Sequence, residues 1–414
     1  MTRRAEVIAI GSELLGPSRV DSNGSFLARR LGAQGIALAF RTIVGDDPAD
    51  LRAAVSTALG RADVVIATGG LGPTVDDLTR EAVSEALGLP LIEDAALVRG
   101  LEERFARHGL SMPPANRRQA MVPAGASVIP NRHGTAPGLL IRTDAGRLLA
   151  LLPGVPVEME RMVEETLLGA IGASEEVFAT RVFKVSGLTE SETDRRLQPA
   201  HAAAGGVEWT ILAAPGQVEI HLRERVPPGA RAAGIERLDA AIAAALGDHL
   251  FGRDDQTLEG VVAAALAGRG ESVAAAESVT GGGVARLLTS IPGASRWFLG
   301  GVVAYTDAAK RALLGVDAAM LATHGAVSEP VARAMAEGIR TRLGATWGVA
   351  TTGYAGPEGG GPDLPPGTVH VAVAGPHLAE HRTWRVPGPR GVVQERSVRS
   401  AIDLLRRSLM RAAA

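Results

Sequence analysis

The sequence predicts an α/β protein in which two parallel-sheet domains flank a small α+β module. Strand and helix patterns alternate in the N-terminal part of the chain and again in the C-terminal part, which is typical of parallel sheets covered by helices on both faces. Between these parts, residues 182–186 and 218–222 read as strands and residues 231–246 as a helix. We therefore expect three domains, at residues 1–172, 173–250 and 251–414.

The N-terminal alternation consists of continuously apolar strands and amphipathic helices. Runs such as Val7–Ile10 and Val64–Ala67 carry no polar residue, so both faces of these strands should be buried. In sheets of this kind, ligands bind beyond the carboxyl ends of the strands. The expected strands are 7–10, 37–44, 63–67 and 147–152, and the expected helices are 23–31 and one that begins at Pro48.

The C-terminal alternation is followed by an antiparallel pair and a closing helix. Periodicity and turn residues set the limits of each element. The expected strands are 272–276, 302–305, 347–351 and the antiparallel pair 368–374 and 381–386. The expected helices are 258–266, one from Gly282, one within 327–343, and 393–412.

Composition and charge exclude several classes of protein. The chain has 414 residues and no cysteine, which excludes a disulfide framework, a thiolate metal site and a cysteine nucleophile. A net charge of −2 argues against a basic surface for nucleic acid. No apolar run approaches the roughly 18 residues of a membrane span. We expect a soluble cytoplasmic protein.

Three segments of the N-terminal domain gather small and acidic residues just after strand ends. They are residues 11–23, 68–79 and 152–159. Glycines at a strand-to-helix turn let backbone N–H groups approach phosphate oxygens, and carboxylates suit Mg²⁺ or a similar cation. The alternative is that Asp76 and Asp77 only cap the following helix. Because three such segments should meet at one rim, a phosphate site is favoured.

The residues of these segments resemble a known family. The runs GGLGPTVDDLT (69–79) and LPGVPVEM (152–159), with residues 116–120 and 131–138, resemble the N-terminal domain of the CinA family, which is similar to molybdopterin-binding proteins. The resemblance implies metal-dependent hydrolysis of ADP-ribose with a divalent cation such as Mg, Mn or Co. By motif position, Asp77 and Thr79 match the Asp-x-Thr that the molybdopterin-binding relatives use at their ligand site. We expect Asp77 to contact the metal, and we further expect metal or water contacts at Glu13, Asp21, Asp76 and Glu158. The expected substrate contacts are Gly69, Gly70, Gly72, Thr74, Thr79, Asn131 and Gly154.

In the C-terminal domain, Ser278 stands at a strand end just before a glycine-rich helix start. Its hydroxyl could face the N–H groups of the first helical turn, which would serve as an oxyanion hole or hold a phosphate. The alternative is that Ser278 or Thr280 only caps the helix. A serine nucleophile also needs a base, which arginine cannot supply and a buried lysine can.

Lysine is rare enough to be informative here. All but two of the 43 basic residues are arginine, and the two lysines are Lys184 and Lys310. Lys310 follows a glycine-rich strand and Tyr305, one of only two tyrosines, whereas Lys184 lies on a strand of the middle module with no site pattern. We therefore expect Lys310 to be the base for Ser278.

Other catalytic patterns do not fit. The chain has no Gly-x-Ser-x-Gly and no Ser-x-x-Lys at Ser278. His377 and His381 are four residues apart, but they should lie in a solvated hairpin loop without a third ligand.

The C-terminal motifs also resemble the CinA family. AESVTGG, GGVVAYTDAAK, Gly325–Ser328 and Thr351–Pro357 look like its nicotinamide mononucleotide deamidase domain. The resemblance implies release of ammonia from the carboxamide, with Ser278 as nucleophile and Lys310 and Tyr305 as proton carriers. It implies substrate or oxyanion contacts at Thr280, Gly281, Gly282, Thr352 and Gly353, and a phosphate contact at Arg390. The chain departs from the family pattern at Val279, Tyr354, Pro389 and Gln394.

The middle module resembles the KH-like module of the same family. It lacks a Gly-x-x-Gly clamp, which argues against RNA binding. The family resemblance also leads us to expect a homodimer. Two rival functions remain: a non-catalytic nucleotide-binding or sensor protein linked to competence, and a protein in which only the C-terminal domain is active.

Overall fold

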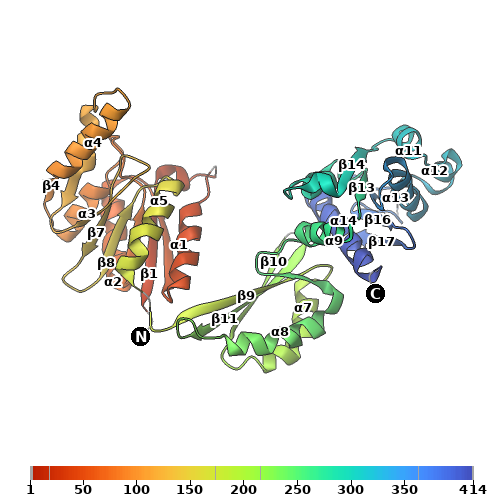
Figure 1. The fold of residues 1–414 in the computed structure, drawn as a ribbon, viewed down its shortest axis with the longest axis horizontal. Coiled ribbons are helices and arrows are strands. Elements are labelled where there is room, and N and C mark those ends of the chain that lie inside the picture. Colours follow the sequence, from red (N-terminus) through yellow and green to blue (C-terminus); the bar gives the residue numbers. More distant parts are fainter. Residues whose placement is uncertain (1–2, 18, 173, 215, 362, 413–414) are drawn as a thin grey trace. The chain divides into compact units, whose positions relative to one another are not determined.

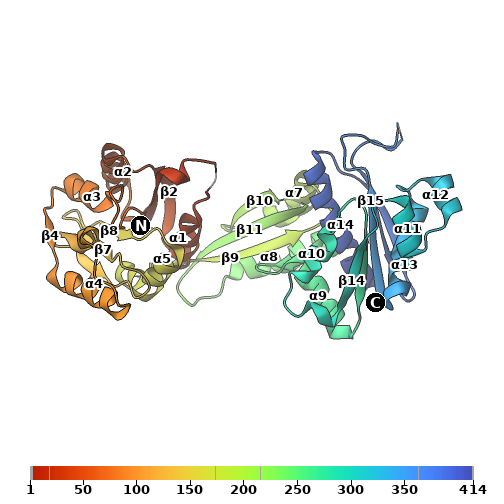
Figure 2. The ribbon, with the colours of Figure 1, turned by 90° about the horizontal axis from the view of Figure 1, so that it is seen from above.

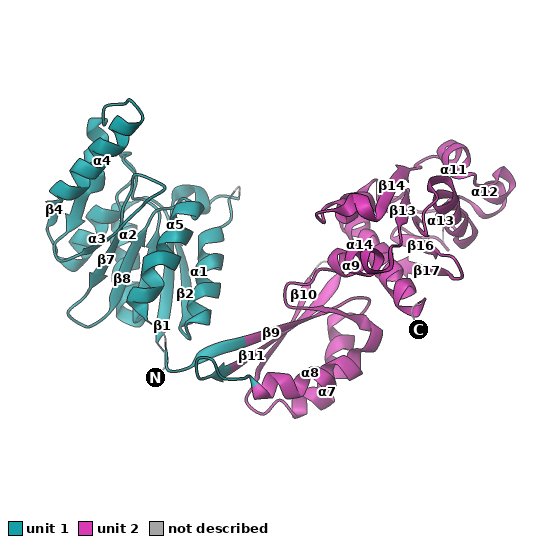
Figure 3. Ribbon diagram, in the orientation of Figure 1, with its two compact units in different colours: residues 1–179, 225–232 teal, residues 180–224, 233–414 magenta. Residues whose placement is uncertain are grey.

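The structure is a computed structural model that describes residues 3–17, 19–172, 174–214, 216–361 and 363–412. The chain divides into two compact units (Figure 3). The first unit comprises residues 1–179 and 225–232, and the second comprises residues 180–224 and 233–414. The predicted division into three domains stays a prediction, since the middle segment is shared between these units.

The first unit is built on a six-stranded mixed sheet of order β2-β1-β3-β8-β7-β6. β2, β1, β3 and β8 are parallel, as the apolar strands predicted. β7 and β6 add an antiparallel edge that the sequence analysis did not include. The strands are β1 (Arg4–Ile10), β2 (Ala37–Val44), β3 (Val64–Thr68), β6 (Ser127–Ile129), β7 (Gly138–Arg142) and β8 (Leu148–Leu152), and the short pair β4 (Leu91–Glu93) and β5 (Met121–Pro123) forms a separate ladder.

Helices cover both faces of this sheet (Figures 1 and 2). Alternate residues of β1 point to opposite faces, so Ile8 packs with Leu51 and Val83 of one helical layer, while Val7 packs with Leu27 and Met159 of the other. The helices are α1 (Ser22–Ala33), α2 (Pro48–Arg61), α3 (Thr79–Leu87), α4 (Ala95–Arg107), α5 (Pro156–Met162) and α6 (Leu168–Ile171), with the 3-10 helices η1 (Ser12–Leu14) and η2 (Pro114–Ala120) and the π-helix η3 (Val163–Leu167).

Most of a four-stranded sheet of order β10-β11-β9-β12, which carries two helices, belongs to the second unit; only the start of β9 and the end of β11 are assigned to the first. β11 alternates buried and half-buried residues, with Val218, Ile220 and Leu222 buried, as the sequence predicted for this strand. The elements are β9 (Val177–Val185), α7 (Glu190–Ala202), β10 (Glu208–Ala214), β11 (Gln217–Val226), α8 (Ala233–Leu246), η4 (Gly247–His249) and β12 (Leu250–Arg253).

The remainder of the second unit is a five-stranded sheet of order β14-β13-β15-β16-β17. β14, β13 and β15 are parallel, and β16 and β17 continue the sheet antiparallel. The predicted α/β class is therefore confirmed here, and the expected antiparallel pair is present. The strands are β13 (Val273–Glu277), β14 (Phe298–Val303), β15 (Trp347–Gly353), β16 (Thr368–Ala374) and β17 (Ala379–Arg385).

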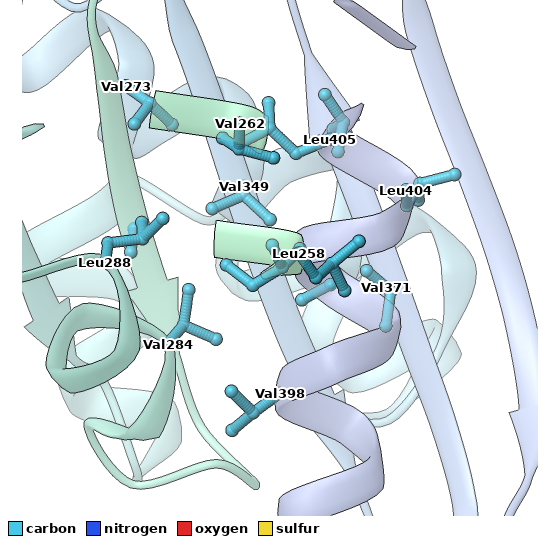
Figure 4. Close-up of a cluster of buried hydrophobic side chains, with 14 of the residues drawn as sticks. Leu258, Val262, Val273, Val284, Leu288, Val349, Val371, Val398, Leu404 and Leu405 are labelled. Atoms are coloured by element: carbon cyan, nitrogen blue, oxygen red, sulfur yellow. The ribbon is translucent and has the colours of Figure 1, made fainter. Parts of the chain in front are cut away.

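The two faces of this sheet differ in side-chain size. Valines such as Val273, Val349 and Val371 pack against α9, α10 and α14 in the core that Figure 4 shows, whereas the opposite face presents alanines such as Ala350 and Ala372 to α13. Small side chains allow α13 to approach the sheet closely. The helices are α9 (Leu258–Arg269), α10 (Gly283–Thr289), η5 (Ala294–Arg296), α11 (Asp307–Leu314), α12 (Ala318–His324), α13 (Glu329–Leu343) and α14 (Arg390–Arg411).

Two local expectations need correction. The strand predicted at 302–305 ends at Val303, so Tyr305 lies in the loop before α11. His381 lies on β17 with its side chain only 6% exposed, and only His377 occupies the exposed turn. The stacked ring of His370 on β16 and the carboxylate of Glu329 on α13 cover the His381 side chain. Within the described residues, no helix is both long enough and apolar enough to cross a membrane.

Candidate functional sites

The C-terminal domain places Ser278 beside Lys310. Ser278 follows the last residue of β13, and its backbone N–H donates to the carbonyl of Thr351 on β15 (2.9 Å). Lys310 lies in the first turn of α11, which Thr306 caps by accepting a hydrogen bond from Ala309 (3.2 Å). The Lys310 Nζ lies 3.3 Å from the Ser278 Oγ. Thirty-one residues thus separate two side chains that the fold brings into hydrogen-bond contact.

The environment of Lys310 favours its neutral form. Its side chain is buried, and Nζ also donates to the carbonyls of Ala304 (3.1 Å) and Tyr305 (3.4 Å). Burial lowers the pKa of Lys310, and the nearby Asp307 opposes this shift. In the neutral amine, the two carbonyls hold both N–H groups, so the lone pair turns toward Ser278. This is the orientation that a general base needs.

The pair opens into a pocket of about 260 Å³. Thr352, at the end of β15, closes one side because its hydroxyl donates to the carbonyl of Ala326 (2.8 Å). The lining residues come from the ends of β13 and β15 and from three loops, and they are Ser278, Val279, Tyr305, Lys310, Ala326, Val327, Thr352, Gly353, Tyr354, Ala355, Gly356, Glu358 and Arg390. The predicted residues Ser278, Tyr305, Lys310, Thr352, Gly353 and Arg390 therefore share one pocket.

Within this pocket, the hydroxyl of Tyr305 contacts Arg390 rather than the serine–lysine pair. The Arg390 Nη2 donates to the Tyr305 hydroxyl (2.6 Å), and its Nη1 donates to the carbonyl of Gly356 (3.2 Å). Tyr305 is 54% exposed. Lys310 contacts only the backbone carbonyl of Tyr305. This geometry favours a binding contact at Tyr305 over the proton transfer implied by the family resemblance.

The helix N-terminus beside Ser278 is already occupied by Glu277. This buried carboxylate accepts from the backbone N–H groups of Gly282 (3.0 Å), Val284 (3.0 Å) and Ala285 (2.8 Å), and Thr280 also donates to it through its hydroxyl (2.6 Å). The N–H groups expected to face the serine hydroxyl are thus taken up within the protein.

Thr280, Gly281 and Gly282 consequently lie outside the Ser278 pocket. They line a separate pocket of about 440 Å³ beside α14, and Gly281 donates its N–H to the carbonyl of Ser278 (3.2 Å). Sequence reasoning missed Glu277. The signal was present, because a single carboxylate ends an apolar strand just before three successive glycines.

In the N-terminal domain, the glycine-rich loop after β3 is supported from within. Gly69 and Gly70 have φ angles of +112° and +63°, which favour glycine. The Thr79 hydroxyl donates to the carbonyl of Gly69 (2.9 Å), and a Cβ at Gly70 would lie 2.1 Å from that hydroxyl oxygen. At the end of β8, Gly154 accepts from the side-chain amide of Asn23 (2.9 Å). Thr79 therefore shapes the loop.

The same loop is closed by Asp77 and held by two arginines. The Asp77 carboxylate accepts from the backbone N–H of Thr74 (2.8 Å) and from its hydroxyl, beneath Gly72. Buried Arg80 donates to the carbonyls of Leu71 (2.8 Å) and Gly72 (2.9 Å), and Arg118 donates to the carbonyl of Thr74 (2.8 Å). Arg80 was missed because arginine is too common in this chain to be informative.

The predicted metal ligands are not brought together. Asp21 caps α1 by accepting from Gly24 (2.7 Å) and pairs with Arg41 (2.7 Å), and Glu158 accepts from the Asn131 side chain (2.6 Å). Among the described residues, no three acidic or histidine side chains are placed to hold a metal ion. Glu13, Asp21, Asp76, Asp77 and Glu158 therefore do not fit a metal cage, although Mg²⁺ commonly needs only one or two carboxylates when substrate phosphates supply the rest.

These observations define a class of protein: an α/β protein with a glycine-rich strand-end loop in one unit and a buried serine–lysine pair in the other. The family models agree with this description. Residues 6–173 match the "Probable molybdopterin binding domain" and residues 255–409 match the "CinA C-terminal domain". The chain belongs to the CinA family.

Two CinA-like proteins match the chain along nearly its whole length, and a solved structure matches part of it. It is 45% identical to a CinA-like protein of Anaeromyxobacter dehalogenans (strain 2CP-C), over 98% of this chain and 100% of that protein. It is 42% identical to a CinA-like protein of Gloeobacter violaceus, over 99% and 97% of the two chains. Among solved structures, competence damage-inducible protein A from Klebsiella pneumoniae is 38% identical over 37% of this chain and 95% of its own, with a TM-score of 0.36.

Proposed function

We propose that the protein is a pyridine-nucleotide hydrolase whose C-terminal domain deamidates nicotinamide mononucleotide to nicotinic acid mononucleotide and ammonia. The observation that carries this proposal is the contact between Lys310 and Ser278 in a pocket (3.3 Å). The family resemblance supplies the substrate. A protein that only bound a nucleotide would have no use for a buried lysine against a serine hydroxyl, because burying an amine is costly.

The reaction would begin at Ser278. Neutral Lys310 takes the hydroxyl proton, and the serine oxygen attacks the carboxamide carbon to give a tetrahedral oxyanion. Val279 lines the pocket, and its backbone N–H, for which no acceptor occurs within the part of the chain that the structure describes, would donate to that oxyanion. Lys310 then returns the proton to the amide nitrogen, and ammonia leaves an acyl-serine.

The second half of the reaction repeats these roles. Lys310 takes a proton from water, the resulting hydroxide attacks the acyl carbon, and the proton returns to the Ser278 oxygen as nicotinic acid mononucleotide is released. Arg390 lies at the pocket beside Tyr305 (2.6 Å). A guanidinium in this place suits the substrate phosphate, since arginine recognises phosphate through paired N–H groups. The chemistry needs no cofactor in this domain.

For the N-terminal domain, we propose hydrolysis of ADP-ribose to AMP and ribose 5-phosphate with a divalent cation. The support is the glycine-rich loop after β3, where the N–H of Gly69 is taken up by the carbonyl of Leu152 (3.0 Å) but the N–H of Gly70 has no acceptor among the described residues. The acidic residues form no metal cage, so the cation would arrive on the substrate diphosphate. Asp76 is exposed on this loop, and we propose that its carboxylate meets the cation.

Product analysis distinguishes this proposal from its rivals. The purified full chain should convert nicotinamide mononucleotide into equal amounts of ammonia and nicotinic acid mononucleotide. Binding without turnover would favour the nucleotide-sensor function linked to competence. For the first domain, the assay is AMP formed from ADP-ribose with and without Mg²⁺. The absence of any metal-dependent product would leave only the C-terminal domain active. Cytoplasmic location and a homodimer remain part of the proposal.

A further inference from the structure

Two buried histidines and one glutamate form a continuous chain behind the Ser278 pocket. The His381 Nδ1 lies 3.3 Å from a carboxylate oxygen of Glu329, and the His381 Nε2 lies 3.0 Å from the His370 Nδ1. The two rings stack, with centroids 5.2 Å apart. Glu329 is half exposed, whereas the histidines are buried. This row of three side chains thus runs from the surface into the protein.

One tautomer of each ring fits these contacts. Because the Glu329 carboxylate lies 3.3 Å from the His381 Nδ1, we assign the proton to that nitrogen, which leaves the His381 Nε2 as an acceptor in the neutral ring. The His370 Nδ1 then donates to it, with the Thr383 hydroxyl 3.4 Å away. The remaining atom, the His370 Nε2, is buried and has no hydrogen-bond partner among the described residues. It is a free acceptor at the inner end of the chain.

That inner end lies on the strand next to β15, which carries a residue of the pocket wall. His370 on β16 is paired in register with Thr352 on β15, and both lie on the sheet face that carries Ala350 and Ala372 toward α13. Thr352 lines the pocket and donates to Ala326, three residues before Glu329. The two histidines and Glu329 therefore connect the two elements that support one wall of the pocket, namely the end of β15 and the start of α13.

We propose that Glu329, His381 and His370 form a positioning relay that holds the Thr352 side of the amidase pocket while both rings are neutral. This inference rests on the proposed deamidase function. A proton on the His370 Nε2 would place a buried charge beside Thr352 with nothing to accept from its new N–H. Burial lowers the pKa of both histidines, Glu329 opposes this for both, and Arg333 adds to it for His381.

The charged groups around the relay are few. Glu329 and Arg333 face it from α13, and Arg333 is itself paired with Glu329 (2.8 Å). Arg385 lies further along the same face of β17. Glu329 is the carboxylate that contacts the rings among the described residues, and it sets the charge at the outer end. It favours protonation, but burial has the larger effect and lowers the pKa of both rings, so their neutral form is favoured and acid protonates them.

The test compares His370→Gln with a matched control, His377→Gln, in the exposed turn before β17. Glutamine at 370 keeps a polar atom near the Nε2 position and does not titrate. We expect the ratio of wild-type to His370→Gln kcat, at saturating nicotinamide mononucleotide, to be flat near neutral pH and to fall about tenfold per pH unit once the relay is protonated. Titration of the substrate and of Lys310 cancels in this ratio. The control ratio should stay flat throughout.

Nitrogen NMR of the imidazoles in the full chain tests the relay without any turnover. We expect an unprotonated His370 Nε2 that titrates below the ordinary histidine value of 6.5, and a further downward shift of the His381 titration in Glu329→Gln. A His370 that titrates at or above 6.5 overturns the relay even if ammonia is released. The expected NMR result without ammonia release would instead refute the deamidase function. A flat activity ratio for His370→Gln in an active enzyme also overturns the positioning role.

Discussion

The Lys310 Nζ lies 3.3 Å from the Ser278 Oγ and donates to two backbone carbonyls at the start of α11. A lysine held in this way has its remaining N–H or lone pair directed at a single atom. The contact joins the end of β13 to the start of α11, so the sheet and the helix together fix the distance. The proposed amidase chemistry depends on this one relationship.

Replacement of Lys310 by arginine should abolish amide hydrolysis. Arginine keeps the positive charge and can donate to the carbonyls, but it cannot accept the serine proton. We expect kcat to fall by about 10²- to 10⁴-fold, the range typical of a lost general base. Lys184→Arg, on β9, is the matched control and should keep wild-type kcat. If Lys310→Arg retained more than a tenth of the activity, Lys310 would act through its charge alone.

The burial of Lys310 also predicts a pH dependence of stability. Its folded pKa is lowered from 10.5, so above the folded pKa the unfolded chain binds more protons than the folded one, and the free energy of unfolding rises with pH until the unfolded lysine is also neutral. Thermal unfolding of wild type and Lys310→Met from pH 7 to 10.5 measures this. The wild type should gain stability relative to the variant as pH rises; a constant difference would refute the shifted pKa.

Arg390 and Tyr305 should affect substrate binding more than turnover. Loss of a hydrogen-bonded contact to a charged group costs about 1.5–3 kcal/mol, so Arg390→Ala should raise KM by roughly 10- to 100-fold at little cost in kcat. Tyr305→Phe removes only the hydroxyl that accepts from Arg390 (2.6 Å) and should have a smaller effect on KM. Steady-state kinetics of both variants measures KM and kcat separately and so shows whether binding or turnover is affected. A Tyr305→Phe kcat as low as that of Lys310→Arg would restore Tyr305 as a proton carrier.

Glu277 should be required for stability. Its carboxylate satisfies three backbone N–H groups at the start of α10, and an amide in its place would turn an N–H toward them. Since an unsatisfied buried donor costs about 1–3 kcal/mol, Glu277→Gln should lower the free energy of unfolding by at least that amount. Urea unfolding measures it, with exposed Glu395→Gln as control. Equal midpoints for the two variants would mean that the helix start needs no carboxylate.

Much of the fold followed from local patterns. The apolar runs of β1, β3 and β13 and the helical spacing of α14 are properties of single segments, so the sequence alone predicted them. The pairing of Ser278 with Lys310 was predicted on chemistry, because a serine needs a base and lysine is scarce. The antiparallel edge of the first sheet was missed, since β6 is only three residues long.

The acidic residues were harder to interpret, because their partners are distant in sequence. Nothing near Asp21 shows that Arg41 will pair with it, and nothing near Glu158 shows that Asn131 will donate to it. His381 seemed to belong to a solvated loop because the expected strand began only at residue 381, whereas β17 begins at Ala379 and includes His381 in the ladder. Tertiary contacts decide which carboxylates remain free for a metal. These contacts cannot be inferred from residue type and spacing.

The most direct test of the central claim is the rate of ammonia release from nicotinamide mononucleotide by the wild-type chain and by Ser278→Ala. Ser290→Ala, at the exposed end of α10, serves as control. We predict that Ser278→Ala loses measurable turnover, while Ser290→Ala keeps the wild-type rate and the folded content of all three proteins is the same by circular dichroism. Equal ammonia release from wild type and a folded Ser278→Ala would contradict the serine mechanism.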